Sequence, residues 1–167
     1  MMPVRLDRLQ SEDQPAVLRL LADSGLPTDG LLDHRETVLV ARLDDRVVAC
    51  AALEVYADGA LLRSVAVAEA LRGSGLGHHV VRAALDVARQ RGTTSVYLLT
   101  TTAEGFFPRF GFQQIARADV PAGVRTSVEF QSACPASAPS PRRLRFCCPQ
   151  HPTRIRRRLG PTPMPST

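Results

Sequence analysis

The sequence predicts a single mixed α/β domain, with an antiparallel N-terminal half and one parallel crossover near its middle. Two observations lead to this prediction. Apolar runs between residues 37 and 67 are separated by tight-turn pairs, and a helical apolar stripe over residues 77–92 is followed by a compact apolar strand. The chain has 167 residues, 44% of them hydrophobic, so one domain with a real core is expected.

The N-terminal part predicts a strand and then a helix. Residues 4–6 are a short strand candidate. A helix begins at Ser11, where Gln14 completes a capping box, and its apolar stripe ends at Gly25. Residues 28–36 are polar and irregular, which fits a loop or a short helix.

Three strands joined by tight turns follow, with Asp44-Asp45 and Asp58-Gly59 as the turns. Asp-Gly between two apolar runs is a strong hairpin signal, because glycine tolerates the positive φ that a type I′ turn requires. A helix then follows Gly77, and it joins two strands in a right-handed βαβ unit with parallel pairing. The predicted strands are residues 37–43, 46–57, 60–67, 95–100, 113–117 and 126–130, with a short helix over 103–110.

The last 29 residues differ in composition from the rest of the chain. Residues 139–167 hold seven Pro, seven Arg and no acidic residue, a net charge of +7, whereas residues 1–138 hold 14 Arg against 16 acidic residues. We therefore expect a domain over 1–138 and a disordered tail over 139–167 that plays no part in the fold. The abrupt break suggests a shifted reading frame; an arginine patch for nucleic acid or acidic lipid is the alternative. No nucleic-acid partner is expected for the near-neutral domain.

Cysteine usage indicates neither a disulfide framework nor a metal site. Cys50 lies in an apolar run and is expected in the core. Cys147 and Cys148 are adjacent and precede His151, whereas zinc ligands come in spaced pairs; Cys134 stands apart. No run approaches the ~20 apolar residues of a membrane span, and the N-terminus lacks a secretory pattern. We expect a cytoplasmic protein without a membrane span or a metal.

The motif Arg-Gly-Ser-Gly-Leu-Gly at residues 72–77 lies between a predicted strand and a predicted helix. Its glycines allow a ligand to approach the backbone, and the helix N-terminus offers unpaired N–H groups to an anion. The motif therefore predicts a pyrophosphate cradle. It does not have the Gly-x-Gly-x-x-Gly spacing of dinucleotide sites or the Gly-Lys-Ser/Thr ending of a P-loop.

The motif resembles the Arg-x-x-Gly-x-Gly coenzyme A signature of the GNAT superfamily of N-acetyltransferases, with Arg72, Gly75 and Gly77 at the key positions. The resemblance extends over residues 1–138, where Gly111-Phe112 is similar to the family's closing segment. It implies a twisted mixed sheet of six or seven strands flanked by helices, with a splayed cleft for acetyl-CoA as the co-substrate. The residues implied in coenzyme A binding are Val65, Ala66, Val67, Arg72, Gly73, Ser74, Gly75, Leu76, Gly77 and His78.

A narrower resemblance concerns residues 61–67, 98–104, Phe106-Phe107 and 134–138. These segments are similar to the N-acetyltransferases of arsenic-resistance operons, whose relatives acetylate the α-amino group of toxic amino acids such as phosphinothricin and arsinothricin. The resemblance implies detoxification as the role of this chain.

Glu54 and Arg63 are the candidates for handling the amine. A two-residue loop at Asp58-Gly59 sets Ala57 opposite Ala60, and therefore Glu54 opposite Arg63. A surface ion pair, worth ~0–1 kcal/mol, explains the pattern equally well. If the pair is functional, Arg63 lowers the pKa of Glu54. Glu54 then fits better as the acceptor for the substrate ammonium, or as a base acting through water, with Arg63 holding a carboxylate.

The remaining catalytic and substrate candidates lie close to the predicted cleft. Ser64 is the third catalytic candidate, and a backbone N–H near Ala66 is expected to face the oxyanion. Many family members place a proton-donating tyrosine in the short helix after the second strand of the βαβ unit, whereas this chain has Phe106, Phe107 and Phe110 there. Tyr97 is expected to pack in the sheet. Possible donors are Thr100, Thr101, Thr102 and water, and the predicted substrate contacts are Thr100, Thr102 and Glu104.

The leading functional prediction is N-acetylation of a small amino-acid-like amine. His78 and His79 are either solvent-facing helix positions or contacts to phosphate or ribose. One alternative is acetylation of a peptide N-terminus, a lysine or a polyamine, and an acidic groove would favour the polyamine. The other alternative is a coenzyme A-binding module without catalysis. A homodimer formed through an edge strand remains open.

Overall fold

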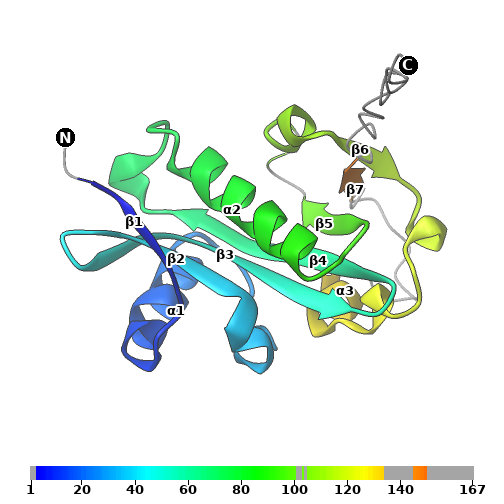
Figure 1. The fold of residues 1–167 in the computed structure, drawn as a ribbon, viewed down its shortest axis with the longest axis horizontal. Helices are drawn as coiled ribbons and strands as arrows, with labels where there is room; N and C mark the ends of the chain where they lie inside the picture. Colours follow the sequence, from blue (N-terminus) through cyan, green and yellow to red (C-terminus); the bar gives the residue numbers. More distant parts are fainter. Residues whose placement is uncertain (1–2, 101–102, 104, 134–144, 150–167) are drawn as a thin grey trace, which may run out of the picture.

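Residues 3–100, 103, 105–133 and 145–149 are described by the computed structural model. Seven strands form one sheet in the order β1-β2-β3-β4-β5-β7-β6 (Figure 1). Neighbouring strands are antiparallel except β4 and β5, which are parallel. The predicted mixed α/β fold, with its antiparallel N-terminal half and single parallel crossover, is confirmed.

The strands are β1 (Arg5–Arg8), β2 (Val38–Leu43), β3 (Arg46–Tyr56), β4 (Gly59–Val67), β5 (Val96–Thr100), β6 (Phe112–Ile115) and β7 (Arg145–Pro149). The α-helices are α1 (Gln14–Asp23), α2 (Leu76–Gln90) and α3 (Val128–Ala133). The 3-10 turns are η1 (Ser11–Asp13), η2 (Leu31–Thr37), η3 (Glu69–Leu71), η4 (Phe107–Phe110), η5 (Arg117–Asp119) and η6 (Val124–Thr126).

The helices cover both faces of the sheet: α2 lies on one face, and α1 and α3 lie on the other (Figure 1). Because side chains alternate across a strand, each strand contributes to both cores. Leu62 of β4 packs in the cluster that contains Val80 of α2. Its neighbour Leu61 faces the opposite side and packs in the cluster that contains Phe130 of α3. Cys50 is buried in the third cluster, with α1, as predicted.

The β3–β4 hairpin forms, but each residue of β3 pairs two residues away from its predicted partner on β4. Tyr56 pairs with Gly59, so Glu54 lies opposite Leu61. Gly59 stands at the start of the strand, where a Cβ would come within 2.9 Å of the Tyr97 ring. The glycine therefore permits close packing rather than a type I′ turn. Gly59 has a φ of 157°, and the left-handed φ values of a type I′ turn occur instead in the other hairpin turn, at Asp44 (49°) and Asp45 (59°).

Three local predictions near the helices are wrong. The capping hydrogen bond runs from the N–H of Gln10 to the carboxylate of Asp13 (2.8 Å), and not between Ser11 and Gln14. Residues 126–130, predicted as a strand, are mostly in α3. Ser127 precedes this helix, and its hydroxyl accepts the N–H of Phe130 (3.4 Å), as an N-cap does. The helix predicted over 103–110 is reduced to η4, because Pro108 and the left-handed Gly111 confine it.

The prediction that residues 139–167 play no part in the fold is wrong for Arg145–Pro149. These residues form β7, which pairs with β5 on one side and β6 on the other. A strand inserted there satisfies the backbone N–H and C=O groups of two edges at once. The high proline and arginine content of the whole tail hid this five-residue window, which contains Phe146, Cys147 and Cys148. The other tail residues lie outside the described part of the chain.

Candidate active site

Strands β4 and β5 separate part-way along their length. Their pairing consists of Ala60–Val96, Leu61–Tyr97 and Leu62–Leu98, and it ends there. The β3–β4 pairing shifts register between Arg63 and Ala66, and Ser64 in this interval has a positive φ of 55°, the geometry of a β-bulge. The predicted opening between these strands is present, and Arg63 and Ser64 stand where it begins.

The backbone of β4 supplies hydrogen-bond donors to this opening. Ala68 donates its N–H to Val48 O on β3 (2.8 Å). Because successive N–H groups along a strand point to opposite edges, Ala66 also faces β3, and Val65 and Val67 face the opening. The N–H groups near Ala66 that face the opening are therefore those of Val65 and Val67, and their role toward an oxyanion stays a prediction.

The glycine loop ends where α2 begins, as predicted. Gly75 is the residue before the helix and has a φ of 90°, and Gly73 has a φ of 80°, both unfavourable for residues with a Cβ. Gly77 is in the first turn, where a Cβ would lie 3.4 Å from the Phe106 ring. Arg72 donates from Nε to Val67 O (3.3 Å), which ties the loop to the end of β4. The loop thus presents backbone N–H groups of a helix N-terminus beside the opening.

A cavity of about 800 Å³ connects the glycine loop to the opening. Arg72, Gly73, Gly75, Gly77 and His78 line one end, and Arg63, Ser64 and Glu129 line another part. Val65, Val67 and Thr100 lie in the wall as well, whereas Ala66, Ser74, Leu76 and Glu54 are not among the lining residues. Thr101, Thr102 and Glu104 lie outside the described residues.

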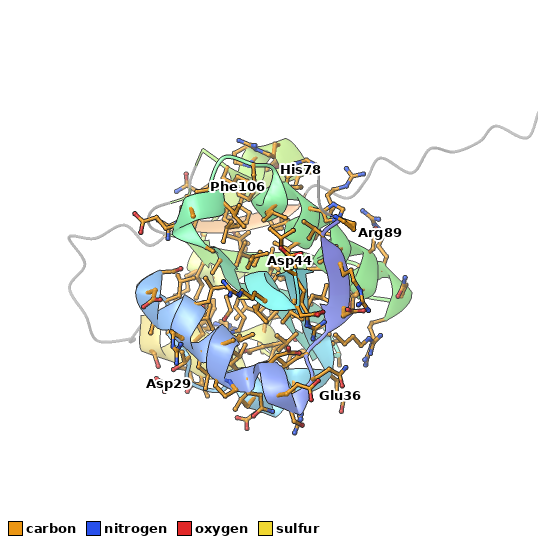
Figure 2. The ribbon with its side chains drawn as sticks, turned by 90° about the vertical axis from the view of Figure 1, so that its left-hand side faces the viewer. Asp29, Glu36, Asp44, His78, Arg89 and Phe106 are labelled. Carbon is orange, nitrogen blue, oxygen red and sulfur yellow. The ribbon has the colours of Figure 1, made fainter. Side chains whose placement is uncertain are left out.

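Phe106 and Phe107 line the cavity, and Phe106 lies beside the glycine loop. The His78 ring packs against Phe110 at 4.8 Å, and the Arg109 guanidinium lies 4.7 Å above the Phe106 ring. Figure 2 shows His78 and Phe106 together at one end of the molecule, away from Asp29 and Glu36. Of the two histidines, His78 lines the cavity and His79 does not. Arg109 is a lining cation that the sequence interpretation missed.

Glu54 and Arg63 form a buried ion pair, not a surface one. Arg63 Nη1 donates to Glu54 Oε1 (2.6 Å), and the two side chains are 0% and 2% exposed. Arg63 lies opposite Ala52, two residues from Glu54 on the same strand face, so the contact is diagonal rather than directly cross-strand. The predicted pairing is present, but it was derived from the wrong register.

Glu54 is surrounded by hydrogen-bond donors. Tyr56 Oη donates to Glu54 Oε2 (2.5 Å), Ser127 is a further hydrogen-bond partner, and His34 Nε2 lies 3.9 Å away. Burial acts to raise the pKa of Glu54, but the hydrogen bonds from Ser127, Tyr56 and Arg63 outweigh it and hold this pKa below its usual value. Tyr56 donates its hydroxyl proton to this carboxylate, and burial, together with this contact, raises the pKa of Tyr56.

Glu129 of α3 is a second carboxylate on Arg63, and the sequence interpretation missed it. Its Oε2 lies 2.7 Å from Arg63 Nε, and its side chain is 11% exposed. Burial raises its pKa to about 7; Arg63 opposes this shift and Glu54 reinforces it. The sequence analysis assigned residues 126–130 to a strand. A helical prediction for this segment was the one sequence signal that could have pointed to Glu129.

The described part of the chain contains no cluster of three or more His, Cys, Asp or Glu residues that could hold a metal ion. Within the same part, no helix is long and apolar enough to cross a membrane. Tyr97 is buried in the sheet, as predicted, and is not among the cavity-lining residues. Cys134 and His151 lie outside the described residues.

Comparison with known proteins identifies the family. Residues 4–112 match the acetyltransferase (GNAT) family. The amino-acid acetyltransferase of Mycobacterium tuberculosis is 36% identical over 129 residues, which cover 70% of this chain and 72% of that protein. The chain belongs to the GNAT acetyltransferase family. It is an N-acetyltransferase, and acetyl-CoA is its co-substrate, as the glycine loop predicted.

Solved structures show the same fold. A Mycobacterium tuberculosis protein in complex with CoA and NLQ superposes with a TM-score of 0.73 at 27% identity, over 87% of this chain and 98% of that one. N-acetylglutamate synthase from Neisseria gonorrhoeae, in complex with coenzyme A and N-acetyl-glutamate, gives a TM-score of 0.73 at 22% identity over 89% of this chain. The match covers 35% of the synthase chain, so this chain spans about a third of that protein.

Proposed function

We propose that this chain transfers the acetyl group of acetyl-CoA to the α-amino group of a small amino acid or amino-acid analogue. The supporting observation is the continuity of the cavity, from the glycine loop to the buried charges around Arg63. Its volume of about 800 Å³ lies in the range of small-molecule sites. The 36% identical relative, named an amino-acid acetyltransferase, supports the same substrate class.

Acetyl-CoA is placed by residues at both ends of the opening. The N–H groups of the first turn of α2, with Arg72, receive the pyrophosphate. The pantetheine arm follows β4 beyond Leu62, where β5 no longer pairs with it. The N–H groups of Val65 and Val67 then face the thioester, and one of them stabilises the oxyanion that forms when the amine attacks.

The charges at the acceptor end favour an amino acid over a polyamine. Two carboxylates, Glu54 and Glu129, surround one guanidinium, Arg63, so the end is mixed in charge rather than a purely acidic groove. The Arg63 side chain is fully buried. Its positive charge therefore acts on the substrate through the wall of the cavity, and not through a direct two-pronged contact with a substrate carboxylate. Ser64, whose Oγ accepts from Arg63 Nε (3.2 Å), retains a hydroxyl proton for the substrate.

The toxic amino acids implied by the arsenic-operon resemblance are the finer form of this proposal. They share the amino-acid head group, so the same site would receive them, and they differ in the side chain that meets the apolar wall. Leu26, Leu62 and Leu98 contribute to that wall. A role in detoxification therefore requires that the enzyme prefer the side chains of the toxic amino acids over those of ordinary amino acids.

The test is acetyl transfer by the full chain. The protein is incubated with acetyl-CoA and a panel of α-amino acids, phosphinothricin, polyamines and short peptides, and products are identified by mass spectrometry. We expect products from amino acids or their analogues only. Products from peptides or polyamines alone would refute the substrate class, while leaving the acetyltransferase activity in place.

A further inference from the structure

We propose that Glu129 on α3 accepts the proton from the substrate ammonium, and that Glu54 serves only to position Arg63. This inference rests on the proposed function, because it concerns the amine that attacks acetyl-CoA. It assigns the base to a residue outside the β3–β4 hairpin, whereas the sequence analysis placed the candidate base, Glu54, within this hairpin.

The location of Glu129 carries the first part of the proposal. Its side chain lines the cavity together with Ser64 and Val65, which stand where β4 leaves β5. Glu54 does not line the cavity, and three side chains already donate hydrogen bonds to its carboxylate. Of the two carboxylates on Arg63, Glu129 is therefore the one that a substrate can reach.

The bonding of Glu129 carries the second part. Among the described residues, its buried Oε2 accepts no hydrogen bond, although Arg63 Nε lies 2.7 Å away. The hydrogen on that nitrogen points to Ser64 Oγ instead (3.2 Å). A buried oxygen that has an ion-pair contact but no hydrogen bond is held at a cost to the fold, so this carboxyl group is less firmly tied to its neighbours than that of Glu54. The 11% of the side chain that is exposed is the part that meets the cavity.

Burial, more than the surrounding charges, makes this carboxyl group a base near neutral pH. The groups that face it are Arg63 from β4 and Glu54 from β3, with His34 of η2 and Tyr56 against the far side of Glu54. Burial and the charge of Glu54 raise the pKa of Glu129 to about 7 against the pull of Arg63. A general base is most effective when its pKa is close to the working pH.

The reaction balances with this assignment. An ammonium N–H bond breaks and its proton passes to the Glu129 carboxylate, which leaves a nitrogen lone pair. This lone pair forms the bond to the acetyl carbon, and the carbon–sulfur bond then breaks with its electrons on sulfur. A second nitrogen proton ends on the coenzyme A thiol, the third stays on the amide, and Glu129 releases its proton to water.

The experiment compares wild type, Glu129→Gln and Glu36→Gln, with Glu36 as an exposed glutamate far from the cavity. Rates are measured from pH 5.5 to 9.5 with the best amine of the panel, and acetyl-CoA affinity is measured by calorimetry. We expect kcat/KM for the amine at pH 7 to fall roughly 100-fold in Glu129→Gln and to stay unchanged in Glu36→Gln. The wild-type rise with an apparent pKa near 7 should disappear in Glu129→Gln, while acetyl-CoA affinity is retained.

Each other outcome has a definite meaning. A Glu129→Gln enzyme that keeps its kcat/KM and the rise near pH 7 overturns the assignment. Lost activity together with lost acetyl-CoA affinity overturns it too, because Glu129 would then be structural. If wild type acetylates only peptides or polyamines, the proposed function fails, and Glu129 is tested with that amine. A wild type that acetylates no amine refutes both proposals.

Discussion

Arg63 holds two carboxylates whose environments shift their pKa values in opposite directions. Glu54 accepts hydrogen bonds from three side chains, and these keep its pKa low despite its burial. Glu129 is also largely buried, but its Oε2 accepts no hydrogen bond from a described residue, and its pKa rises to about 7. A carboxylate with a raised pKa weakens the folded state when it is ionised, so the two residues have opposite effects on stability.

Replacement of Glu129 by glutamine should stabilise the protein at pH 8. The folded pKa of about 7 exceeds the ordinary value of 4.5, so wild type loses stability as the pH rises between these values. We expect Glu129→Gln to unfold like wild type at pH 4.5 and to be more stable at pH 8 by about 2 kcal/mol. Urea unfolding at both pH values measures this. A variant less stable than wild type at pH 8 would show that Glu129 is a structural ion-pair partner.

Replacement of Glu54 by glutamine should have the opposite effect. The folded pKa of Glu54 is lowered, so its contribution is present above the ordinary value and is lost as the pH falls through the folded pKa. At pH 8, Glu54→Gln leaves Arg63 with one charged partner fewer in a buried site, a loss of roughly 3 kcal/mol. The same urea unfolding series measures it, and equal stability of variant and wild type at pH 8 would contradict the buried pair.

The glycine loop, which we propose binds coenzyme A, was the most predictable part of the site. The spacing of Arg72, Gly75 and Gly77 was sufficient, because a glycine loop before a helix has a local geometry that the sequence alone specifies. The parallel unit of β4, α2 and β5 was predictable for the same reason. The hairpin register was not, because Gly59 is required by the Tyr97 ring across the sheet and not by its own turn.

The α2 N-terminus gives a prediction for coenzyme binding. A side chain at Gly77 would extend between Phe106 (3.4 Å) and Val67 (3.6 Å), into the cavity beside the loop. We expect Gly77→Val to raise the KM for acetyl-CoA at least tenfold, a cost of about 1.4 kcal/mol or more in binding. His79→Ala, on an exposed neighbour outside the cavity, is the control. Equal KM values in both variants would show that acetyl-CoA does not bind beside this loop.

At the scale of the whole molecule, sequence composition gave a wrong prediction for a segment whose structure depends on pairing with strands far away in the sequence. Arg145–Pro149 was assigned to a disordered tail because its surroundings are rich in proline and arginine, but the sheet has room for it between β5 and β6. Glu129 was missed for a related reason. Its role depends on α3 packing beside Arg63, more than sixty residues earlier in the chain, and no local pattern reports such a contact.

Deletion of residues 139–167 should therefore destabilise the protein. Without β7, strands β5 and β6 each lose their shared hydrogen-bonding partner. We expect the thermal midpoint of the 1–138 chain to fall by about 5 °C or more relative to the full chain. Calorimetric scans of both chains measure the shift. An unchanged midpoint would restore the view that the tail plays no part in the fold.

The most direct test of the central claim is a crystal structure of the full chain with coenzyme A and the acetylated product of its best substrate. The account predicts the pyrophosphate at the α2 N-terminus, the acetyl oxygen at the N–H of Val65 or Val67, and the amide nitrogen beside Glu129. A product bound against Glu54, or an acetyl group away from the opening between β4 and β5, would contradict the account.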